Sequence, residues 1–146
     1  MRVSVIGGST VTDEEYALAE RVGRELAERG HTVVCGGLTG AMEAVAKGAS
    51  EAGGETIGIL PGEDRDEANE YVDVAVATGI GDARNALVAL NGDAAIAIDG
   101  GYGTLSEIAL ALNGGLPVAG LRTHDVEGVE AVDDPVAAVE YVEDRA

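Results

Sequence analysis

Short, almost wholly apolar segments alternate with longer amphipathic segments along most of the chain. The apolar segments lack the alternation of polar and apolar residues that marks a strand with one face in water. They are typical of a parallel sheet that is buried on both faces and has helices as its crossovers. We therefore predict one α/β domain over residues 1–146, a doubly wound Rossmann-like domain with a mostly parallel sheet of about six or seven strands and helices on both faces.

The predicted strands cover residues 2–6, 32–35, 56–60, 71–77, 94–98 and 117–121. The first predicted helix follows Thr12, whose spacing to Glu15 is that of a capping box, and ends before Gly30. Further helices are predicted over residues 41–52, 82–90, 104–112 and 135 to about 143, with Asp82 and Asp134 as N-caps. Residues 122–133 are predicted to form a loop or an edge element.

The chain is strongly acidic, with 27 Asp and Glu residues against nine Lys and Arg, and its formal net charge is −18. Such a field repels nucleic acid and anionic membranes, so neither is an expected partner. The acids are spread along the periodic segments, as in proteins of organisms whose cytosol is rich in salt. We expect a halophilic, cytoplasmic protein, because no apolar run approaches the roughly 18 residues of a membrane span and the N-terminal run is too short for a signal peptide.

Residue types that often carry chemistry are expected to be structural in three places. The single Cys35 excludes an internal disulfide and ends a strand-like run, which favours a small buried side chain. His31 and His124 have no metal-ligand neighbours at the spacing of a zinc site. The acidic segment 63–70 is interpreted as a solvated loop. No specific metal site is therefore predicted.

Glycines cluster where three predicted strands end and the next helix begins, at residues 7–8, 36–40 and 100–103. The carboxyl ends of parallel strands share one edge of a sheet, and ligands of open α/β sheets bind beyond that edge. Glycine lets the backbone approach a ligand closely, and a helix N-terminus offers free N–H groups to an anion. The clusters favour a site for a phosphate-bearing ligand over glycines that only make tight turns.

Two charged residues follow this edge. Arg84 is predicted in the first turn of a helix, against the preference of the helix dipole, which indicates a role in anion binding. Arg65 and Arg122 also follow strands and are expected within reach. Glu107 has capping-box spacing to Thr104, so a structural role stays open. Its functional role would be to accept a ribose hydroxyl or to stabilise an oxocarbenium ion, with the helix N-terminus keeping it ionised.

Neither a P-loop nor a dinucleotide fingerprint is present. The segment GGYGTLSE at residues 100–107 instead resembles the PGGxGTxxE motif of the Lonely Guy (LOG) family. The members of that family are phosphoribohydrolases that cut the N-glycosidic bond of cytokinin nucleoside monophosphates. GGLTGAM at residues 36–42 resembles the second glycine loop of the family, and Arg84 falls where the family has its catalytic Arg. Asp99 stands in place of the family's Pro, and Asn85 in place of its Lys.

The short chain, with GAMEAVAKGA, GILPG and TGIGDARN, is more similar to the branch that contains molybdenum-cofactor carrier proteins. This resemblance implies a homodimer that binds a phosphorylated nucleotide or a pterin-type ligand, such as the molybdenum cofactor or a nucleoside monophosphate, without clear catalysis. The alternative is a nucleoside 5′-monophosphate phosphoribohydrolase, in which Arg84 binds the phosphoribosyl group and Glu107 stabilises the ribosyl cation as water attacks C1′. Whether the protein is an enzyme stays open. Besides Arg84 and Glu107, the predicted ligand-binding residues are Gly7, Gly8, Ser9, Gly36, Gly37, Gly40, Met42, Asn85, Gly100, Gly101, Gly103 and Thr104.

Overall fold

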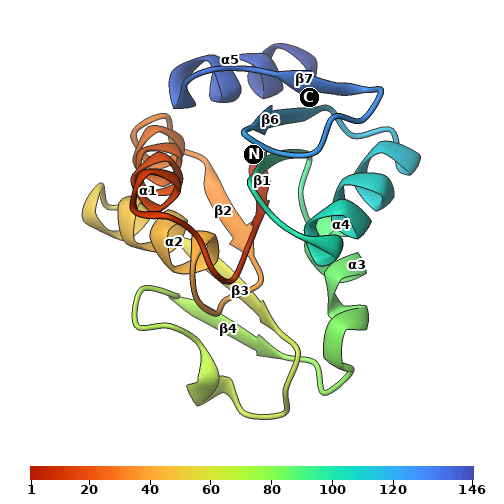
Figure 1. The fold of residues 1–146 in the computed structure, drawn as a ribbon. Helices are drawn as coiled ribbons and strands as arrows, with labels where there is room; N and C mark the ends of the chain where they lie inside the picture. Colours follow the sequence, from red (N-terminus) through yellow and green to blue (C-terminus); the bar gives the residue numbers. More distant parts are fainter.

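The computed structural model describes all 146 residues and confirms the predicted class, with one seven-stranded sheet and helices on both of its faces (Figure 1). Every strand pair is parallel, and the spatial order is β4-β3-β2-β1-β5-β6-β7. The strand order therefore reverses between β1 and β5, which is where doubly wound sheets form a ligand crevice. The strands are β1 (Arg2–Gly7), β2 (Thr32–Cys35), β3 (Thr56–Leu60), β4 (Val74–Ala77), β5 (Ala94–Ile98), β6 (Val118–Leu121) and β7 (Val129–Ala131).

Helices α1, α2 and α5 cover one face of the sheet, and α3 and α4 cover the other (Figure 1). None of them has the length and apolar character that crossing a membrane requires. The helices are α1 (Asp13–Glu28), α2 (Ala41–Glu51), α3 (Asn85–Leu90), α4 (Tyr102–Asn113) and α5 (Pro135–Arg145), with short 3-10 helices η1 (Arg65–Glu67) and η2 (Gly81–Arg84).

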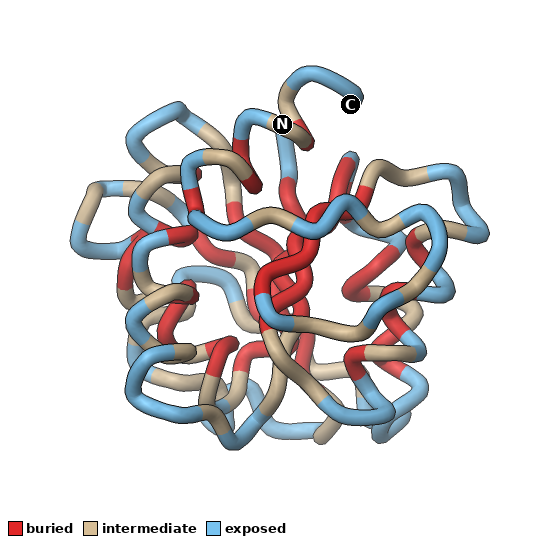
Figure 2. The backbone as a smooth tube through the Cα atoms, turned by 45° about the horizontal axis from the view of Figure 1, so that its top comes forward, coloured by how far each residue is buried: buried red, intermediate tan, exposed pale blue.

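The buried core follows the sheet, and the red segments at the centre of Figure 2 are its central strands. Alternate residues of one strand serve the two faces, as the pleat requires. Val3 and Val5 of β1 pack with α1, α2 and α5, whereas Ile6 packs with Val88 of α3 and Ile108 of α4. The core contains no Phe or Trp. Its shape therefore depends on close packing of Val, Ile, Leu and Ala.

Several predicted boundaries are confirmed and others are wrong. Thr12 caps α1 through the expected box, in which Glu15 N–H donates to Thr12 Oγ1 over 3.2 Å and Thr12 N–H donates to Glu15 Oε1 over 3.0 Å. Residues 122–133 include an edge strand, β7, paired with β6. The strand predicted to begin at Tyr71 begins at Val74. The helix predicted from Asp82 begins as η2, and its α-helical part starts only at Asn85, without a side-chain cap.

Helices α1 and α2 cross at two glycines with their backbones in contact. A Cβ added at Gly48 would lie 1.9 Å from the carbonyl oxygen of Glu20, and one added at Gly23 would lie 2.0 Å from that of Val45. No side chain fits into either space. Both glycines are buried, so the sequence uses them to bring two helices together.

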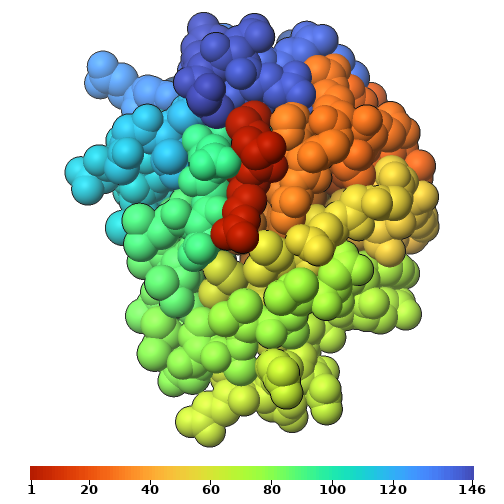
Figure 3. All heavy atoms as spheres, turned by 180° about the vertical axis from the view of Figure 1, so that it is seen from behind, coloured from red at the N-terminus to blue at the C-terminus, as the bar shows by residue number.

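One part of the sheet lacks a covering helix. Val74 and Val76 of β4 are 45% and 43% exposed, although strands of parallel sheets are normally buried on both faces. Together with Ile57 of β3 and Leu87 of α3, they line a shallow hollow of about 290 Å³. The start of β1, red in Figure 3, also reaches the surface, and the exposed Arg2 lies at the opposite end of the strand from the glycine loops.

Candidate ligand-binding site

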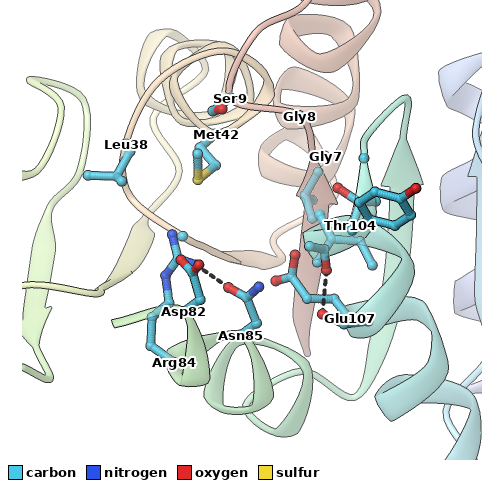
Figure 4. Close-up of a pocket in the computed structure, with 17 residues that line it drawn as sticks. Gly7, Gly8, Ser9, Leu38, Met42, Asp82, Arg84, Asn85, Thr104 and Glu107 are labelled. Carbon is cyan, nitrogen blue, oxygen red and sulfur yellow. Dashed lines mark hydrogen bonds between the residues drawn. The ribbon is translucent and has the colours of Figure 1, made fainter. Parts of the chain in front are cut away.

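A cavity of about 540 Å³ opens at the carboxyl ends of β1 and β2, between the starts of α2 and α4 and the η2–α3 segment (Figure 4). This volume lies in the range typical of small-molecule sites. The cavity borders β1, where the strand order reverses. It is lined by Val5, Ile6, Gly7, Gly8, Ser9, Gly36, Leu38, Met42, Asp82, Arg84, Asn85, Gly101, Tyr102, Gly103, Thr104, Ser106 and Glu107.

The structure brings most of the predicted site residues together in this cavity, including Arg84 and Glu107. Three predicted glycines do not line it. Gly37 and Gly40 have φ angles of 77° and 66°, and they pack against Leu60 and against Gly8 and Ser9, respectively. Gly100, with φ 104°, gives its space to the Thr104 side chain. These three glycines are needed for the shape of the loops.

The first two glycine loops are joined to each other. Ala41 N–H donates to the carbonyl oxygen of Gly8 over 2.9 Å, and Thr39 Oγ1 donates to that of Ser9 over 3.0 Å. A Cβ at Gly40 would lie 2.4 Å from the Gly8 carbonyl oxygen. Gly40 is therefore required for contact between the loops, and the two loops form one wall of the cavity.

The opposite wall is the start of α4. This helix follows Gly101, and no side chain caps it. The predicted Thr104–Glu107 capping box is wrong, because the helix already begins at Tyr102 and both residues lie inside it. A helix start without a side-chain acceptor leaves N–H groups and the positive end of the helix dipole available to an anion.

Arg84 is buried, only 8% exposed, at the end of η2. Its Nε donates to the carbonyl oxygen of Ile59 over 2.9 Å, and its Nη1 donates to Asn85 Oδ1. Nη2 approaches Gly36, where an added Cβ would lie 2.8 Å away. The lack of a side chain at Gly36 thus makes room for the guanidinium group. These bonds fix the guanidinium group through Nε and Nη1, whereas Nη2 makes no hydrogen bond within the protein.

Glu107 lies on α4, 7% exposed, with its carboxyl group directed toward Asn85 (Figure 4). No hydrogen bond from the protein reaches this carboxyl group. Burial raises the pKa of Glu107 from 4.5 to about 8, and the positive charge of Arg84 offsets only part of that rise. The prediction that the helix N-terminus keeps Glu107 ionised is therefore wrong, because desolvation outweighs the nearby positive charges.

Other charged residues expected near the site lie elsewhere. Arg122 forms an ion pair with Glu14 at 2.9 Å, and neither Arg65 nor Arg122 lines the cavity. Asp99 does not line the cavity but lies directly behind it, because a Cβ added at the lining residue Gly8 would be 3.1 Å from its carboxyl oxygen. Burial and the nearby Glu15 carboxylate raise the pKa of Asp99. Arg84 is the only basic residue among the lining residues.

Part of the lining was not predicted from the sequence, namely Val5, Ile6, Leu38, Asp82, Tyr102 and Ser106. Tyr102 and Ser106 lie within the GGYGTLSE segment, so the motif itself was the available signal. Tyr102 is 91% exposed at the rim. Ser106 Oγ donates to the carbonyl oxygen of Gly103 over 2.6 Å, which supports the loop from inside the helix. Cys35 is buried as predicted, and burial raises its pKa to about 11.

The model of the SLOG cluster4 family matches residues 1–146. An uncharacterized protein of Archaeoglobus fulgidus is 45% identical over 142 residues, which cover 97% of this chain and 93% of that protein. A cytokinin riboside 5′-monophosphate phosphoribohydrolase of Mycobacterium tuberculosis is 38% identical over 115 residues, which cover 77% of this chain and 59% of that enzyme.

Among solved structures, the molybdenum cofactor binding protein of Rippkaea orientalis is similar, with a TM-score of 0.92 and 34% identity. The alignment covers 98% of this chain and 95% of that one. The molybdenum cofactor carrier protein of Chlamydomonas reinhardtii aligns with a TM-score of 0.88 and 32% identity, over 98% of this chain and 96% of that one.

Proposed function

Since the chain belongs to the SLOG cluster4 family, we propose that it is a binding protein that holds a phosphorylated nucleotide or a pterin-type ligand in the cavity between α2 and α4. The observation that carries this proposal is the uncapped start of α4, which faces the only basic side chain of the cavity, Arg84. In a chain of net charge −18, an anion binds only where local positive potential exceeds the global field. The name of the Rippkaea orientalis relative supports a molybdenum cofactor as one cargo of this type.

We propose that backbone N–H groups of Gly101, Gly103 and Thr104 bind the phosphate. A helix start binds phosphate through such groups, and Gly101 leaves open space where a side chain would stand. The joined loops on the opposite side contribute Gly8 and Ser9. Leu38 and Met42 give that wall an apolar surface, which suits a flat heteroaromatic ring (Figure 4).

Hydrolysis of nucleoside monophosphates is the second candidate function, and the match to the Mycobacterium tuberculosis enzyme favours it. The chain spans about 59% of that enzyme's length. The protonated state of Glu107 weighs against hydrolysis, because stabilising a ribosyl cation needs an ionised carboxylate. With a pKa of about 8, the group is largely protonated at neutral pH. Ligand binding is therefore the better-supported function.

One experiment separates the two functions. The protein is incubated in molar KCl with AMP, GMP and inorganic phosphate, its melting temperature is recorded, and free base is measured by chromatography. We expect the melting temperature to rise with the nucleotides and no base to be released, because binding to the native state stabilises it. The rise should be lost in Arg84→Ala. Robust base release that Glu107→Ala abolishes would establish the hydrolase instead, and no shift with any phosphorylated compound would reject the binding function.

We also propose that the chain forms a homodimer through the uncovered part of the sheet around Val74 and Val76. The support is that this mainly apolar surface, in which Arg2 is the only charged lining residue, belongs to an edge of the sheet that lacks a helix in a strongly acidic molecule. Light scattering should give twice the chain mass, and Val76→Lys should give a folded monomer. A cytoplasmic location is proposed because the acidic composition suits a salt-rich cytosol.

A further inference from the structure

The floor of the cavity contains three buried polar side chains, Arg84, Asn85 and Glu107, each no more than 8% exposed. Arg84 can only donate hydrogen bonds. Because its Nη1 donates to Asn85 Oδ1, the orientation of the Asn85 amide is fixed, and Asn85 Nδ2 is left to donate elsewhere.

The free amide group of Asn85 faces the cavity. Nδ2 lies 3.3 Å from the position that a Cβ of Gly103 would occupy, so it sits beneath the glycine loop at the start of α4. No hydrogen bond from Nδ2 to a protein acceptor is present. The only fully enclosed side-chain polar atom without a hydrogen-bond partner is Thr56 Oγ1, so Asn85 Nδ2 is open to the cavity and available to a ligand atom.

Glu107 is the second polar side chain of the floor without a hydrogen-bond partner from the protein, and its carboxyl group opens into the cavity and points toward Asn85 (Figure 4). In its undissociated form, a carboxyl group offers one O–H donor beside its acceptor oxygen. Glu107 also lies one helical turn beyond Gly103, so its Cα is about 6 Å further along the axis of α4 than the Cα of Gly103, where the phosphate is proposed to bind. That spacing fits a group a few bonds away from the phosphorus atom.

We propose that Asn85 Nδ2 and the undissociated carboxyl group of Glu107 together bind an uncharged oxygen of the ligand, a hydroxyl or ring oxygen of a sugar-like unit next to the phosphate, and that Arg84 is a positioning residue that holds Asn85 in place. This inference rests on the proposed function, because it needs a phosphorylated ligand in the cavity. In this arrangement Arg84 does not contact the phosphate directly but acts through Asn85.

A pH dependence follows from this arrangement. The groups that face Glu107 are Arg84 of η2 and the buried Cys35 of β2, and Asp82 and Tyr102 line the same cavity. Above the pKa of about 8, Glu107 loses its donor and places a negative charge near the phosphate. The phosphate is already a dianion there, since its second pKa is about 6. Affinity should therefore fall about tenfold between about pH 7 and about pH 9.

The test is calorimetric titration with ribose 5-phosphate and with inorganic phosphate, in molar KCl, at both pH values. The wild-type protein should show the tenfold fall for ribose 5-phosphate. Glu107→Gln keeps a neutral donor in the same shape but has no proton to lose, so its affinity for ribose 5-phosphate should not change between the two pH values. Asn85→Asp keeps the oxygen that accepts from Arg84 but removes the donor, so it should lose the preference for ribose 5-phosphate over inorganic phosphate.

The outcomes separate the two proposals. If neither compound binds, the proposed function fails. If both bind and wild-type affinity for ribose 5-phosphate is flat with pH, or Glu107→Gln keeps the wild-type slope, only the present inference is overturned. A Glu107→Gln protein that does not fold is replaced by a carbon-13 titration of the Glu107 carboxyl group in the wild type. An ordinary acidic titration there would overturn the inference, and proton loss only at mildly alkaline pH would support it.

Discussion

The crossing of α1 and α2 and the start of α4 both depend on glycine, and they use it in opposite ways. At the crossing, Gly23 and Gly48 lack a side chain because the neighbouring helix backbone already fills the space. At the start of α4, nothing lies within 4 Å of the position where a Cβ of Gly101 would be. The glycines at the crossing allow two helix backbones to pack closely, whereas the glycine at the start of α4 leaves space for a ligand. Glycine content alone therefore does not locate a site.

Salt concentration should have the largest effect on stability, because salt screens the charges of the whole acidic surface and does not act only on the helix crossing or the start of α4. The net charge of −18 favours unfolding through self-repulsion unless salt screens it. We expect helical circular dichroism and melting temperature to fall sharply in dilute buffer relative to molar KCl. Equal stability under both conditions would contradict the halophilic interpretation. The destabilisation caused by packing variants at the helix crossing should not change with salt.

Gly48→Ala should disrupt the crossing. The added methyl group would overlap the Glu20 carbonyl oxygen, and two helix backbones would have to separate, which we expect to cost about 3 kcal/mol of unfolding free energy. Urea unfolding in molar KCl measures this loss. Gly114→Ala is the matched control, because its new Cβ would meet its nearest atom at 3.4 Å, so the change should stay within about 0.5 kcal/mol. Similar losses in both variants would refute the distinction.

Glu107→Gln should stabilise the free protein near neutral pH. The native pKa of about 8 lies above the ordinary value of 4.5, so between these values the unfolded chain has lost a proton that the native protein keeps. Stability therefore falls as pH rises through this window. At about pH 7 the variant should gain about 3 kcal/mol, and the gain should shrink toward about pH 5. The exposed Glu28→Gln should show no such change. A loss of stability at neutral pH would contradict the assigned protonation.

Gly101→Ala should show the other use of glycine. Its methyl group would enter open space, so unfolding free energy should change by no more than about 0.5 kcal/mol. At the proposed phosphate position the same methyl group should weaken AMP binding about tenfold, or about 1.4 kcal/mol. Unfolding and calorimetric titration of one sample measure both quantities. A variant that binds AMP like the wild type would place the phosphate elsewhere.

Most of the fold could be predicted because apolar runs and glycines report directly on strands and their ends. Boundaries failed where the local signal was ambiguous. Tyr71 and Val72 suit a strand as well as Val74 does, but the backbone N–H of Val72 bonds to Asn69 in a turn. Thr104 and Glu107 have the spacing of a capping box, yet Gly101 already ends the loop and starts the helix. Spacing alone does not show which of two starts a helix takes.

The resemblance to the LOG family is confirmed, and the structure places Arg84, Glu107 and most of the predicted glycines around one cavity, whereas their role in ligand binding stays a prediction. The charge of Glu107 was not predictable. Proximity to a helix start suggests that Glu107 is ionised. Its burial, which only the assembled structure shows, raises its pKa and favours the protonated form. The partner of Arg84 was also hidden, because Asn85 is its neighbour in sequence and neighbours on a helix usually point apart.

The bonds from Ala41 to Gly8 and from Thr39 to Ser9 have a consequence for motion. Two loops more than thirty residues apart are tied into one mechanical unit, so neither opens without the other. A molecule that contacts only Ser9 would therefore also reduce local opening at the beginning of α2. Slower deuterium uptake at the Ala41 amide would detect this effect.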